Sequence, residues 1–484
     1  MPAVVSVVFW FVAIAGHRTH GFTTVFRNGE LLYDTSQNRI QAHGAGAIKV
    51  GATYYWIGEN RNGDNTFRHV SAYRSTDLVN WDFANDILSQ SSAPELAVAN
   101  IERPKVIYND EINQFVLWMH WENGVDYSQA RTAVAVSDTV DGNYTYLGSF
   151  RPLGYDSRDM TVFVDDDANK TAYLFSATND NADLNVYELT PDYTNVTRVV
   201  TTLWEGSYRE APGIVKRNGV YVCITSQSTN WTPNLQKYAT ATSINGPWGN
   251  LTSLSDNDSI THGSQNAFLL PLSDNASSVL YMGDRWAGAW SQPVSDSEYV
   301  WLPLVFTSDT QLSLPWYPAL SFNISAATIT GVAEGVGSAA AYFSLEPLFS
   351  GKCIDVPGQS LANGTAVIQY TCNDGANQQY QILQVPDNTN EYVIIARHSH
   401  LCLALQSATA ANGILVEQQV CNFSDTTQLW QFDAVSGVSS GFTVVSVFAG
   451  KCLDVTGYST ANSVAIELYD CNGGQNQQLI LVGV

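Results

Sequence analysis

Five polar side chains stand at regular distances along the first two thirds of the chain, each ahead of a short apolar stretch. Successive members are 51 to 59 residues apart, and they are His43, Glu102, Asp159, Glu210 and Gln265. After Glu210 the chain runs through an apolar stretch, an Asn218-Gly219 pair and a second apolar stretch. An Asn-Gly pair in that setting predicts a β-hairpin, and the other four positions have the same design.

A repeat of roughly 50 to 60 residues built from hairpins is typical of propeller blades. The sequence therefore predicts an all-β fold with a five-bladed β-propeller over residues 21–330. Residues 22–33 are expected to supply an outer strand that closes the ring. If each unit opens with the innermost strand, the five leading residues meet at one mouth of the central axis. A buried polar ring is costly unless it meets a polar ligand, so this mouth is the predicted site.

Paired carboxylates at such a mouth suit glycoside cleavage. An inverting glycosidase needs a protonated acid at the glycosidic oxygen and a base that holds water on the opposite face, about 6.5–9.5 Å away. We predict Glu210 as the acid, because the nearby Pro212 favours an extended backbone that holds the side chain towards the axis. Asp159, one unit earlier, would raise the pKa of Glu210 if the two are close.

Composition limits the partners. The chain has 484 residues, too many for one ordinary domain, and a net charge of −23, which argues against nucleic acid and anionic membranes because both would be repelled. The sequence has no Gly-rich phosphate loop and no paired CxxC motif, so no cofactor is expected. His43 and His120 lack a matching carboxylate spacing, and we interpret them as ring or wall residues with no metal. A monomer is expected.

The start of the chain points to the secretory route. Residues 3–16 form an apolar run too short to span a bilayer, and residues 1–20 are interpreted as a signal peptide. No basic residue precedes that run, so a truncated or mis-started N-terminus is the alternative. Ten Asn-X-Ser/Thr sequons favour a secreted glycoprotein. They begin at Asn143, Asn169, Asn195, Asn230, Asn250, Asn257, Asn275, Asn323, Asn363 and Asn422.

The last third of the chain differs in composition and in cysteine content. Residues 331–341 are rich in Gly and Ala and are predicted to be a linker ahead of a second domain at 342–484. Six of the seven cysteines fall there in pairs 19 residues apart: Cys353 and Cys372, Cys402 and Cys421, Cys452 and Cys471. Three such repeats predict a pseudo-threefold β structure. Six cysteines allow fifteen pairings, and the equal spacing favours one disulfide within each repeat. Cys223 is left over as an expected buried thiol.

The repeats also share short motifs. The first and third open with Lys-Cys-Ile/Leu-Asp-Val, and the three close with Asn377-Gln-Gln-Tyr, Thr427-Gln-Leu-Trp and Asn476-Gln-Gln-Leu. On these motifs residues 342–484 resemble the ricin-B-type β-trefoil, the family 13 carbohydrate-binding module. The resemblance implies a sugar site where a carboxylate binds hydroxyls and an aromatic ring supports the sugar face. The implied residues are Asp355, Tyr370, Asn377 and Gln378 in the first lobe, and Asp454, Tyr469, Asn476 and Gln477 in the third, with Glu467 where Gln is usual. Ala404 and Gln419 depart from the pattern, so the middle lobe is expected to be structural; the alternative is a trefoil retained only for folding.

The first two thirds of the chain resemble glycoside hydrolase family 43, most closely its exo-β-1,3-galactanases. The resemblance rests on Gln41-Ala-His-Gly-Ala-Gly, Tyr54-Tyr-Trp-Ile-Gly-Glu59, Glu102-Arg-Pro-Lys, Ser157-Arg-Asp159, Glu210-Ala-Pro-Gly, Ser264-Gln-Asn-Ala-Phe and Tyr281-Met-Gly-Asp-Arg-Trp286. It implies Glu210 as the acid and Asp159 as the residue that sets its pKa. Glu59, Tyr127 and Trp231 are implied contacts of the terminal sugar.

One departure affects the catalytic base. Most of family 43 has an Asp base at the head of the first blade, where this chain has His43-Gly44. The galactanases share that loss, and their base is assigned to the Gln matching Gln265, as an imidic acid, or to the Glu matching Glu102. Glu102 is chemically the simpler base but could instead bind a sugar hydroxyl, so both assignments stay open.

The sequence thus predicts a secreted, inverting enzyme that releases galactose from the non-reducing end of β-1,3-galactan, the main chain of arabinogalactan. The trefoil would hold the enzyme on the polysaccharide. Within the family the alternative is a β-xylosidase or α-arabinofuranosidase. From another class, the alternative is a lectin that binds galactosides without cleaving them. The missing Asp base motivates the lectin, whereas the retained Asp159 and Glu210 argue against it.

Overall fold

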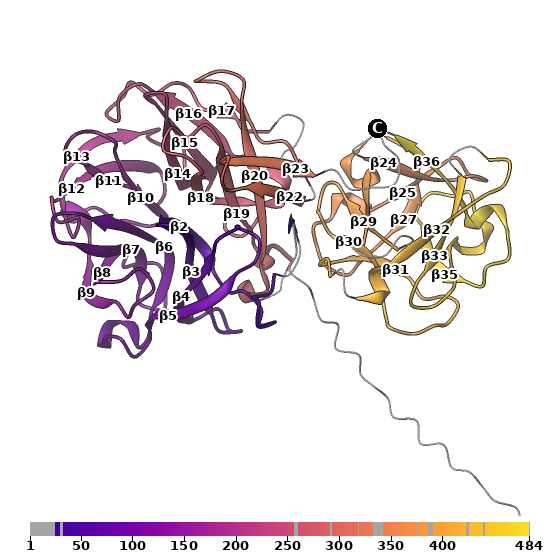
Figure 1. The fold of residues 1–484 in the computed structure, drawn as a ribbon. Coiled ribbons are helices and arrows are strands. Elements are labelled where there is room, and N and C mark those ends of the chain that lie inside the picture. The colour runs from indigo at the N-terminus through magenta and orange to yellow at the C-terminus, as the bar shows by residue number, and fades with distance from the viewer. Residues whose placement is uncertain are drawn as a thin grey trace, which may run out of the picture.

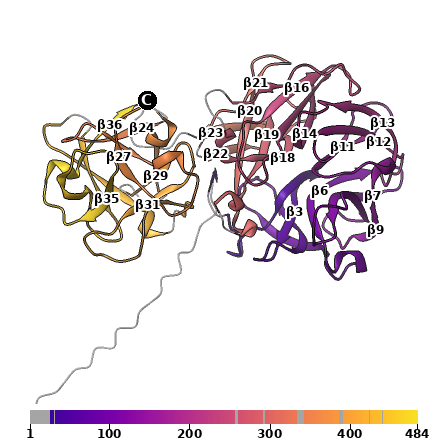
Figure 2. The same ribbon diagram turned by 180° about the vertical axis from the view of Figure 1, so that it is seen from behind.

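The chain folds into two all-β bodies that lie side by side (Figure 1; Figure 2 shows the reverse side). This computed structural model describes residues 25–29, 32–255, 260–290, 293–317, 319–332, 342–373, 375–385, 391–422, 425–438 and 441–483. Among these residues no helix is long and apolar enough to cross a membrane. The expected signal peptide, residues 1–20, lies outside the described residues.

The first body is built from four-stranded antiparallel sheets that repeat along the chain like propeller blades. Five such sheets lie within the described residues, and each takes its four strands in chain order. They are β2 (His43–Val50), β3 (Thr53–Arg61), β4 (Phe67–Ser75) and β5 (Asp82–Ser89); β6 (Asn100–Asn109), β7 (Gln114–Glu122), β8 (Arg131–Ser137) and β9 (Thr145–Phe150); β10 (Met160–Val164), β11 (Ala172–Thr178), β12 (Asp183–Leu189) and β13 (Val196–Leu203); β14 (Arg209–Arg217), β15 (Val220–Gln227), β16 (Lys237–Ala241) and β17 (Thr252–Ser253); β18 (Gln265–Pro271), β19 (Val279–Arg285), β20 (Glu298–Phe306) and β21 (Leu312–Ser313).

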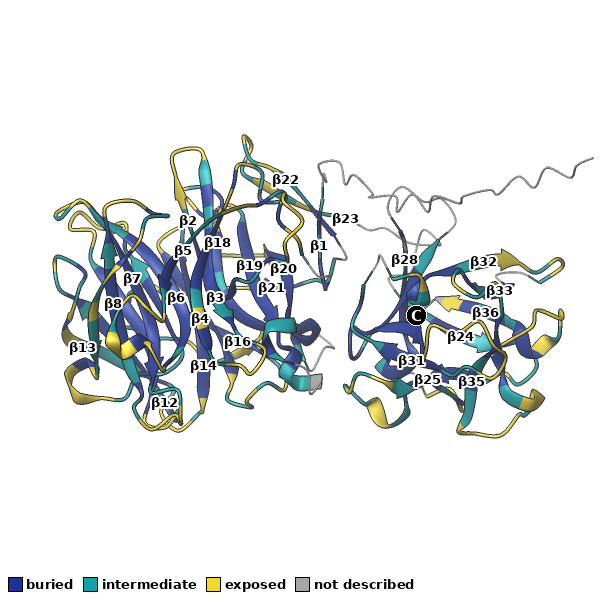
Figure 3. Cartoon of the chain, turned by 90° about the horizontal axis from the view of Figure 1, so that it is seen from below, coloured by how far each residue is buried: buried dark blue, intermediate teal, exposed yellow. Residues whose placement is uncertain are grey.

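The first strand of each sheet lies at the centre of this body. Strand β2 packs against β6, β6 against β10, β10 against β14, β14 against β18, and β18 against β2. The first two strands of each sheet are mostly buried, and Figure 3 shows much of them in dark blue. Hydrophobic side chains such as Trp118, Leu174 and Val222 fill the space between neighbouring sheets because both faces of each sheet are covered.

The N-terminal segment differs from the expectation. Residues 22–33 were expected to close the ring, but β1 (Phe26–Arg27) instead pairs with β22 (Ala319–Asn323), which pairs with β23 (Thr328–Val332) in a separate three-stranded sheet. The fifth four-stranded sheet draws all its strands from residues 265–313, so no N-terminal strand is needed there. Gly331 and Val332, assigned to the linker, end β23, and residues 333–341 lie outside the described part.

The second body is a sheet of thirteen short strands wrapped around one core. Its core draws on all three repeats, with Tyr380, Trp430 and Leu468 all fully buried. The strands are β24 (Phe343–Pro347), β25 (Cys353–Asp355), β26 (Thr365–Ala366), β27 (Ile368–Tyr370), β28 (Tyr380–Gln384), β29 (Tyr392–Ala396), β30 (Cys402–Leu405), β31 (Val416–Gln419), β32 (Trp430–Ala434), β33 (Gly441–Ser446), β34 (Cys452–Val455), β35 (Val464–Tyr469) and β36 (Gln478–Gly483).

Short 3-10 helices connect the strands in both bodies. They are η1 (Pro94–Leu96), η2 (Pro152–Gly154), η3 (Thr261–Gly263), η4 (Ala287–Trp290), η5 (Val294–Asp296), η6 (Pro357–Gln359), η7 (Ala376–Gln378), η8 (Thr426–Gln428), η9 (Thr456–Tyr458) and η10 (Gln475–Gln477).

Disulfides join the cysteines within each repeat of the second body. The bonded pairs are Cys353–Cys372, Cys402–Cys421 and Cys452–Cys471, all with a sequence separation of 19. The remaining cysteine, Cys223, is a buried free thiol on β15, and burial raises its pKa far above the usual value. A thiol held in its neutral form is a poor nucleophile, so Cys223 serves the core.

Candidate active site

One cavity of about 340 Å³ opens at the mouth of the ring of inner strands. Four of the five leading residues line it, namely Glu102, Asp159, Glu210 and Gln265, together with the expected sugar contacts Glu59, Tyr127 and Trp231. The other lining residues are Arg61, Arg103, His120, Arg158, Asn181, Ser228, Asn230 and Trp286. The repeat spacing thus brings together side chains that are more than fifty residues apart in the sequence.

A shared backbone feature aims the leading side chains. The strand register shifts just after His43, Glu102 and Glu210. In each case the next residue has a positive φ: 54° at Gly44, 53° at Arg103 and 50° at Ala211. An extra residue in a strand bends the strand and changes the direction of the neighbouring side chains. The same irregularity at three strand heads therefore accounts for the direction of the leading side chains there.

The fifth leading residue, His43, does not reach the cavity. It is fully buried behind it, stacked on Tyr299 with ring centroids 5.1 Å apart. Its Nδ1 lies 3.3 Å from Asp284 Oδ1 and its Nε2 lies 3.2 Å from Gln41 Oε1. A Cβ added to Gly44 would lie 2.4 Å from Glu59 Oε1, so the carboxylate of Glu59 fills the space that a side chain at position 44 would need. The expectation that all five leading residues meet at the mouth is therefore wrong for His43, which packs behind the cavity.

Glu210 has the properties of a carboxylic acid that stays protonated near neutral pH. Burial raises its pKa to about 8, and the negative charge of Asp159 adds to that effect. The Glu210 carboxylate accepts hydrogen bonds from Gln265 Nε2 at 3.0 Å and from Asn181 Nδ2 at 3.3 Å. These bonds fix the carboxyl group at the cavity wall.

Gln265 uses every hydrogen-bonding position of its amide. Its Oε1 accepts from Arg103 Nη2 at 2.6 Å and from Trp286 Nε1 at 2.7 Å. Its Nε2 donates to Glu210 Oε1 and, at 2.8 Å, to Ser226 Oγ. An imidic acid carries its proton on the oxygen, and both described partners of that oxygen are N–H donors. The contacts therefore favour the ordinary amide tautomer in this conformation.

Glu102 belongs to a buried charged network. It accepts hydrogen bonds from Arg61 Nη2 at 2.8 Å, Tyr127 OH at 2.6 Å and His120 Nδ1 at 3.2 Å. Burial alone would raise the pKa of Glu102, but the bond from His120 and the charge of Arg61 hold it far below its usual value. Glu102 is therefore ionised, and Glu59, paired with Arg61 at 2.5 Å, has its pKa raised by burial to about 7.

Three side chains in the cavity have the composition of a cation site. Ligand atoms of Glu102, His120 and Asp159 all lie within 4.8 Å of one another. Both nitrogens of the His120 ring face carboxylates, Glu102 on one side and Glu122 on the other. Burial alone would lower the pKa of His120, but these two bonds raise it to about 9. A protonated imidazole has no lone pair for a metal, so the group fits an ion-pair network better than a metal site.

Aromatic rings form one wall of the cavity. Trp231 packs against Trp286 with ring centroids 5.2 Å apart, and the guanidinium of Arg103 lies 5.6 Å from the Trp286 ring. Tyr127 is 40% exposed while its hydroxyl donates to Glu102. Such rings offer a face to the apolar side of a sugar, and the carboxylates offer acceptors to its hydroxyls.

In the second body, the first and third lobes repeat one polar arrangement. Asp355 Oδ2 accepts from Asn377 Nδ2 at 3.0 Å and from Gln378 Nε2 at 2.7 Å. Asp454 Oδ2 accepts from Asn476 Nδ2 at 2.9 Å and from Gln477 Nε2 at 2.8 Å. The expected aromatic ring of each lobe is partly exposed: Tyr370 is 39% exposed in the first lobe and Tyr469 is 43% exposed in the third. At the matching position in the middle lobe, Ala404 is fully buried.

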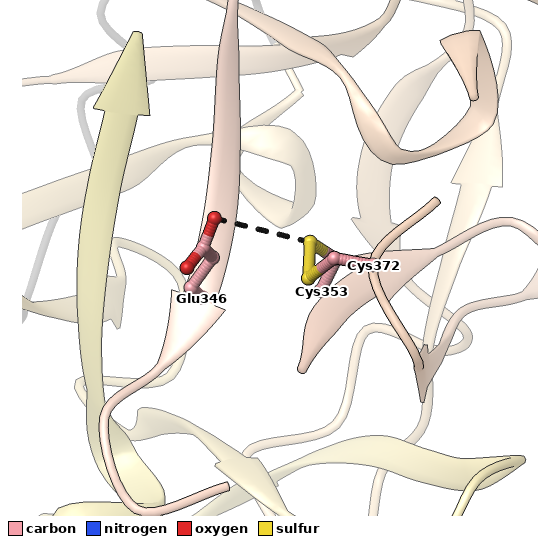
Figure 4. A group of neighbouring side chains, drawn as sticks. All are labelled: Glu346, Cys353 and Cys372. Atoms are coloured by element: carbon pink, nitrogen blue, oxygen red, sulfur yellow. Dashed lines mark hydrogen bonds between the residues drawn. A yellow bond between two sulfur atoms is a disulfide. The ribbon is translucent and has the colours of Figure 1, made fainter. Parts of the chain in front are cut away.

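Glu346 lies beside the first disulfide of this body, as Figure 4 shows. Its Oε1 is 4.0 Å from Cys353 Sγ, and these atoms with Cys372 have the composition of a metal-binding group. Both sulfurs belong to the disulfide, however, so neither can act as a thiolate ligand. The group is structural.

Several cavity residues were not predicted from the sequence: Arg61, Arg103, Arg158, Asn181, Ser228 and Trp286. Three of them stand inside motifs that attracted attention for other residues: Arg103 directly after Glu102, Arg158 directly before Asp159, and Trp286 at the end of Tyr281–Trp286. Of the other three, Arg61 ends the second strand of its sheet, and Asn181 and Ser228 follow the second strands of theirs, where the sequence has no distinct pattern.

Comparison with known proteins identifies both bodies. The model of the glycosyl hydrolases family 43 matches residues 41–267, and the ricin-type β-trefoil lectin domain matches residues 341–479. An exo-β-1,3-galactanase from Clostridium thermocellum is 41% identical, with a TM-score of 0.64, over 96% of this chain and 100% of that chain. This chain belongs to glycosyl hydrolases family 43.

Other solved members of family 43 agree. An exo-β-1,3-galactanase from Phanerochaete chrysosporium, solved with β-1,3-galactotriose and with galactose, is 29% identical with a TM-score of 0.65 over 95% of this chain and 100% of that chain. A β-1,3-galactosidase is 27% identical with a TM-score of 0.57 over 95% of this chain and 94% of that chain. A search of the curated proteins found no match. The resemblances to family 43 and to the ricin-type trefoil are confirmed.

Proposed function

We propose that this family 43 protein is a secreted, monomeric exo-β-1,3-galactanase that releases galactose from the non-reducing end of β-1,3-galactan by inversion. Its domains are a five-bladed propeller at residues 21–330 and a sugar-binding trefoil at 342–484. The similarity to galactanases that bind galactose and β-1,3-galactotriose supports the substrate. The three disulfides of the trefoil favour an oxidising, extracellular setting.

The observation that carries the proposal is the position of Glu210, which is buried at the wall of the cavity that it shares with Asp159. A carboxyl group whose pKa is raised to about 8 keeps its proton at neutral pH and can give it to the departing glycosidic oxygen. Burial and Asp159 hold that proton in place until the leaving group accepts it.

Two residues are candidates for the base, and the structure gives an argument against each. Gln265 lies beside the acid, but its amide nitrogen is 3.0 Å from Glu210 Oε1, closer than the roughly 6.5–9.5 Å expected between acid and base in an inverting enzyme. Glu102 is ionised and retains an unused lone pair on Oε2 among its described contacts, but its low pKa makes it a weak base. Gln265 would have to rotate away from Arg103 or Trp286 to hold water.

A pair of substitutions separates the two. Gln265→Glu places an ordinary carboxylate where the amide stands, whereas Glu102→Gln removes the charge with little change in shape. If Gln265 is the base, the Gln265→Glu enzyme remains active and Glu102→Gln raises KM more than it lowers kcat. If Glu102 is the base, Glu102→Gln loses kcat by a factor of about 10² or more, and azide, attacking from the face that water would use, restores turnover with an α-galactosyl azide product.

Galactose release from linear β-1,3-galactan tests the proposed function itself. Wild type should release monosaccharide only, whereas Glu210→Gln should bind the polymer and release none. Release of xylose or arabinose from xylan or arabinan by wild type, with no galactose from galactan, would assign the other family activity. Binding of galactan without any product would make the protein a lectin.

A further inference from the structure

The middle lobe of the trefoil, the one without an Asp at the sugar position, faces the propeller. Strands β29 and β30 lie on the side of the trefoil nearest the first body (Figures 1 and 2). Between them His400 is buried, with its ring 5.1 Å from the ring of Trp316. Trp316 Nε1 also donates to Gln381 Oε1 at 2.7 Å. Two side chains of the trefoil, His400 and Gln381, thus contact Trp316 of the first body.

A buried arginine extends this contact into the propeller. Arg285 is 1% exposed and pairs with Glu298, its Nη1 lying 3.3 Å from Glu298 Oε2. The same Nη1 donates to the backbone oxygen of His400 at 3.2 Å, and Nη2 donates to the backbone oxygen of His262 at 3.2 Å. One guanidinium therefore ties the trefoil turn to the η3 segment of the propeller.

The space around this contact is full. A Cβ added to Gly263 would lie 3.0 Å from Cδ2 of His400 and 3.4 Å from Nε of Arg285, and φ at Gly263 is +71°. The His400 ring therefore packs directly over the backbone of η3. A movement of the His400 ring would displace the backbone at Gly263, because the ring packs on that backbone with no side chain of Gly263 between them.

Both segments held by Arg285 lead into the active site. Arg285 ends β19, and the next residue, Trp286, donates its indole N–H to Gln265 Oε1. His262 and Gly263 lie in η3, which ends one residue before Ser264 and two before Gln265. Gln265 and Asp284 are directly paired across β18 and β19. The trefoil contact is therefore continuous along the chain with Gln265 and with Trp286, one of the two donors to its amide oxygen.

We propose that docking of the trefoil holds Gln265 and Trp286 in position, so that His400 and Gln381 are positioning residues for catalysis on the propeller. The inference rests on the proposed function, in which Gln265 belongs to the catalytic machinery. The trefoil then has a second role, independent of any sugar bound in its first and third lobes. His400 belongs to the middle lobe, which lacks the Asp of a sugar site, and Gln381 lies on β28 at the end of the first lobe.

The consequence is a defect in turnover on a substrate too short to reach the trefoil. Small displacements of a reacting group lower the rate steeply, by up to about 10²-fold for 1 Å. Loosening the contact should therefore lower kcat on β-1,3-galactobiose about ten-fold, while KM changes less than about two-fold because the expected sugar contacts Glu59 and Tyr127 lie on other segments.

The test uses the full-length protein. The weakening variant combines His400→Ala and Gln381→Ala, which removes the ring over η3 and the acceptor of Trp316. The conservative variant combines His400→Phe and Gln381→Glu, which keeps a ring and an acceptor. Asp433→Ala, an exposed residue of β32, serves as the matched control on the same domain. The readouts are kcat and KM on β-1,3-galactobiose, with thermal unfolding to confirm that each variant is folded.

The proposal expects low kcat with near-normal KM in the weakening variant, recovery in the conservative variant and wild-type behaviour in the control. A weakening variant that is folded and retains the wild-type kcat would overturn it, and a lower melting temperature alone would assign the contact a purely structural role. If wild type itself releases no galactose, the proposed function fails first.

Discussion

The most informative single substitution is Asp159→Asn. It removes one negative charge from the cavity and leaves an oxygen of the same shape to accept the hydrogen bond from Arg103 Nη2, which lies 2.9 Å from Asp159 Oδ2. Since the charge of Asp159 helps to raise the pKa of Glu210 to about 8, the substitution lowers that pKa. Glu210 is active only while protonated, so activity is lost at a lower pH than in wild type.

The size of the shift follows from Coulomb's law. At an effective dielectric constant of about 20, a unit charge about 10 Å away is worth about 1.7 kcal/mol, or roughly one pKa unit. Asp159 and Glu210 line the same cavity, so a shift of at least about one unit is expected, from about 8 to about 7. Burial is the larger cause of the raised pKa, and it remains in the variant.

The assay is the pH dependence of kcat/KM for galactose release from β-1,3-galactobiose, which reports groups of the free enzyme. The basic limb should move to lower pH in Asp159→Asn. The control is Asp110→Asn, an exposed residue after β6 that carries the same charge outside the cavity. A basic limb that stays in place or moves to higher pH in Asp159→Asn would refute the assignment of Glu210 as the acid.

Three further predictions concern the acid, the trefoil and its disulfides. Glu210→Gln should lower kcat by about 10²–10⁴ without unfolding the protein, which rate measurements and thermal unfolding check together; retention of the wild-type rate would remove Glu210 from the chemistry. Combining Asp355→Ala with Asp454→Ala should abolish depletion of the enzyme from solution by insoluble galactan, and unchanged depletion would mean that the trefoil does not hold the polymer. Replacing Cys402 and Cys421 by Ala should lower the free energy of unfolding by about 3 kcal/mol in denaturant titration, and a change below about 1 kcal/mol would show that the disulfide adds little to packing.

Much of the architecture could be predicted because it repeats. The period of the hairpins predicted the blade-like sheets, and the equal cysteine spacing predicted the three lobes of the second body. The N-terminal segment was different because Phe26 and Arg27 pair with a strand nearly three hundred residues later. Such a pairing leaves no local pattern, since its register is set by tertiary packing.

The sequence predicted the site residues that stand at the start of each repeat. It did not predict the residues that hold those side chains in place. Glu102, Asp159, Glu210 and Gln265 carried the period, and the structure gathers all four in one cavity. Arg103 and Trp286 carry no period of their own, yet they make both hydrogen bonds to Gln265 Oε1. Only the three-dimensional arrangement indicates that the amide oxygen already has two donors, a fact that bears on the choice of base.

The most direct test of the central claim follows the anomeric configuration of the first product by NMR, with linear β-1,3-galactan and wild-type enzyme. The account predicts that α-galactose appears first and then equilibrates with the β form, and that Glu210→Gln gives no product. Initial release of β-galactose would contradict the inverting mechanism. Binding of galactan with no galactose released would contradict the enzyme itself.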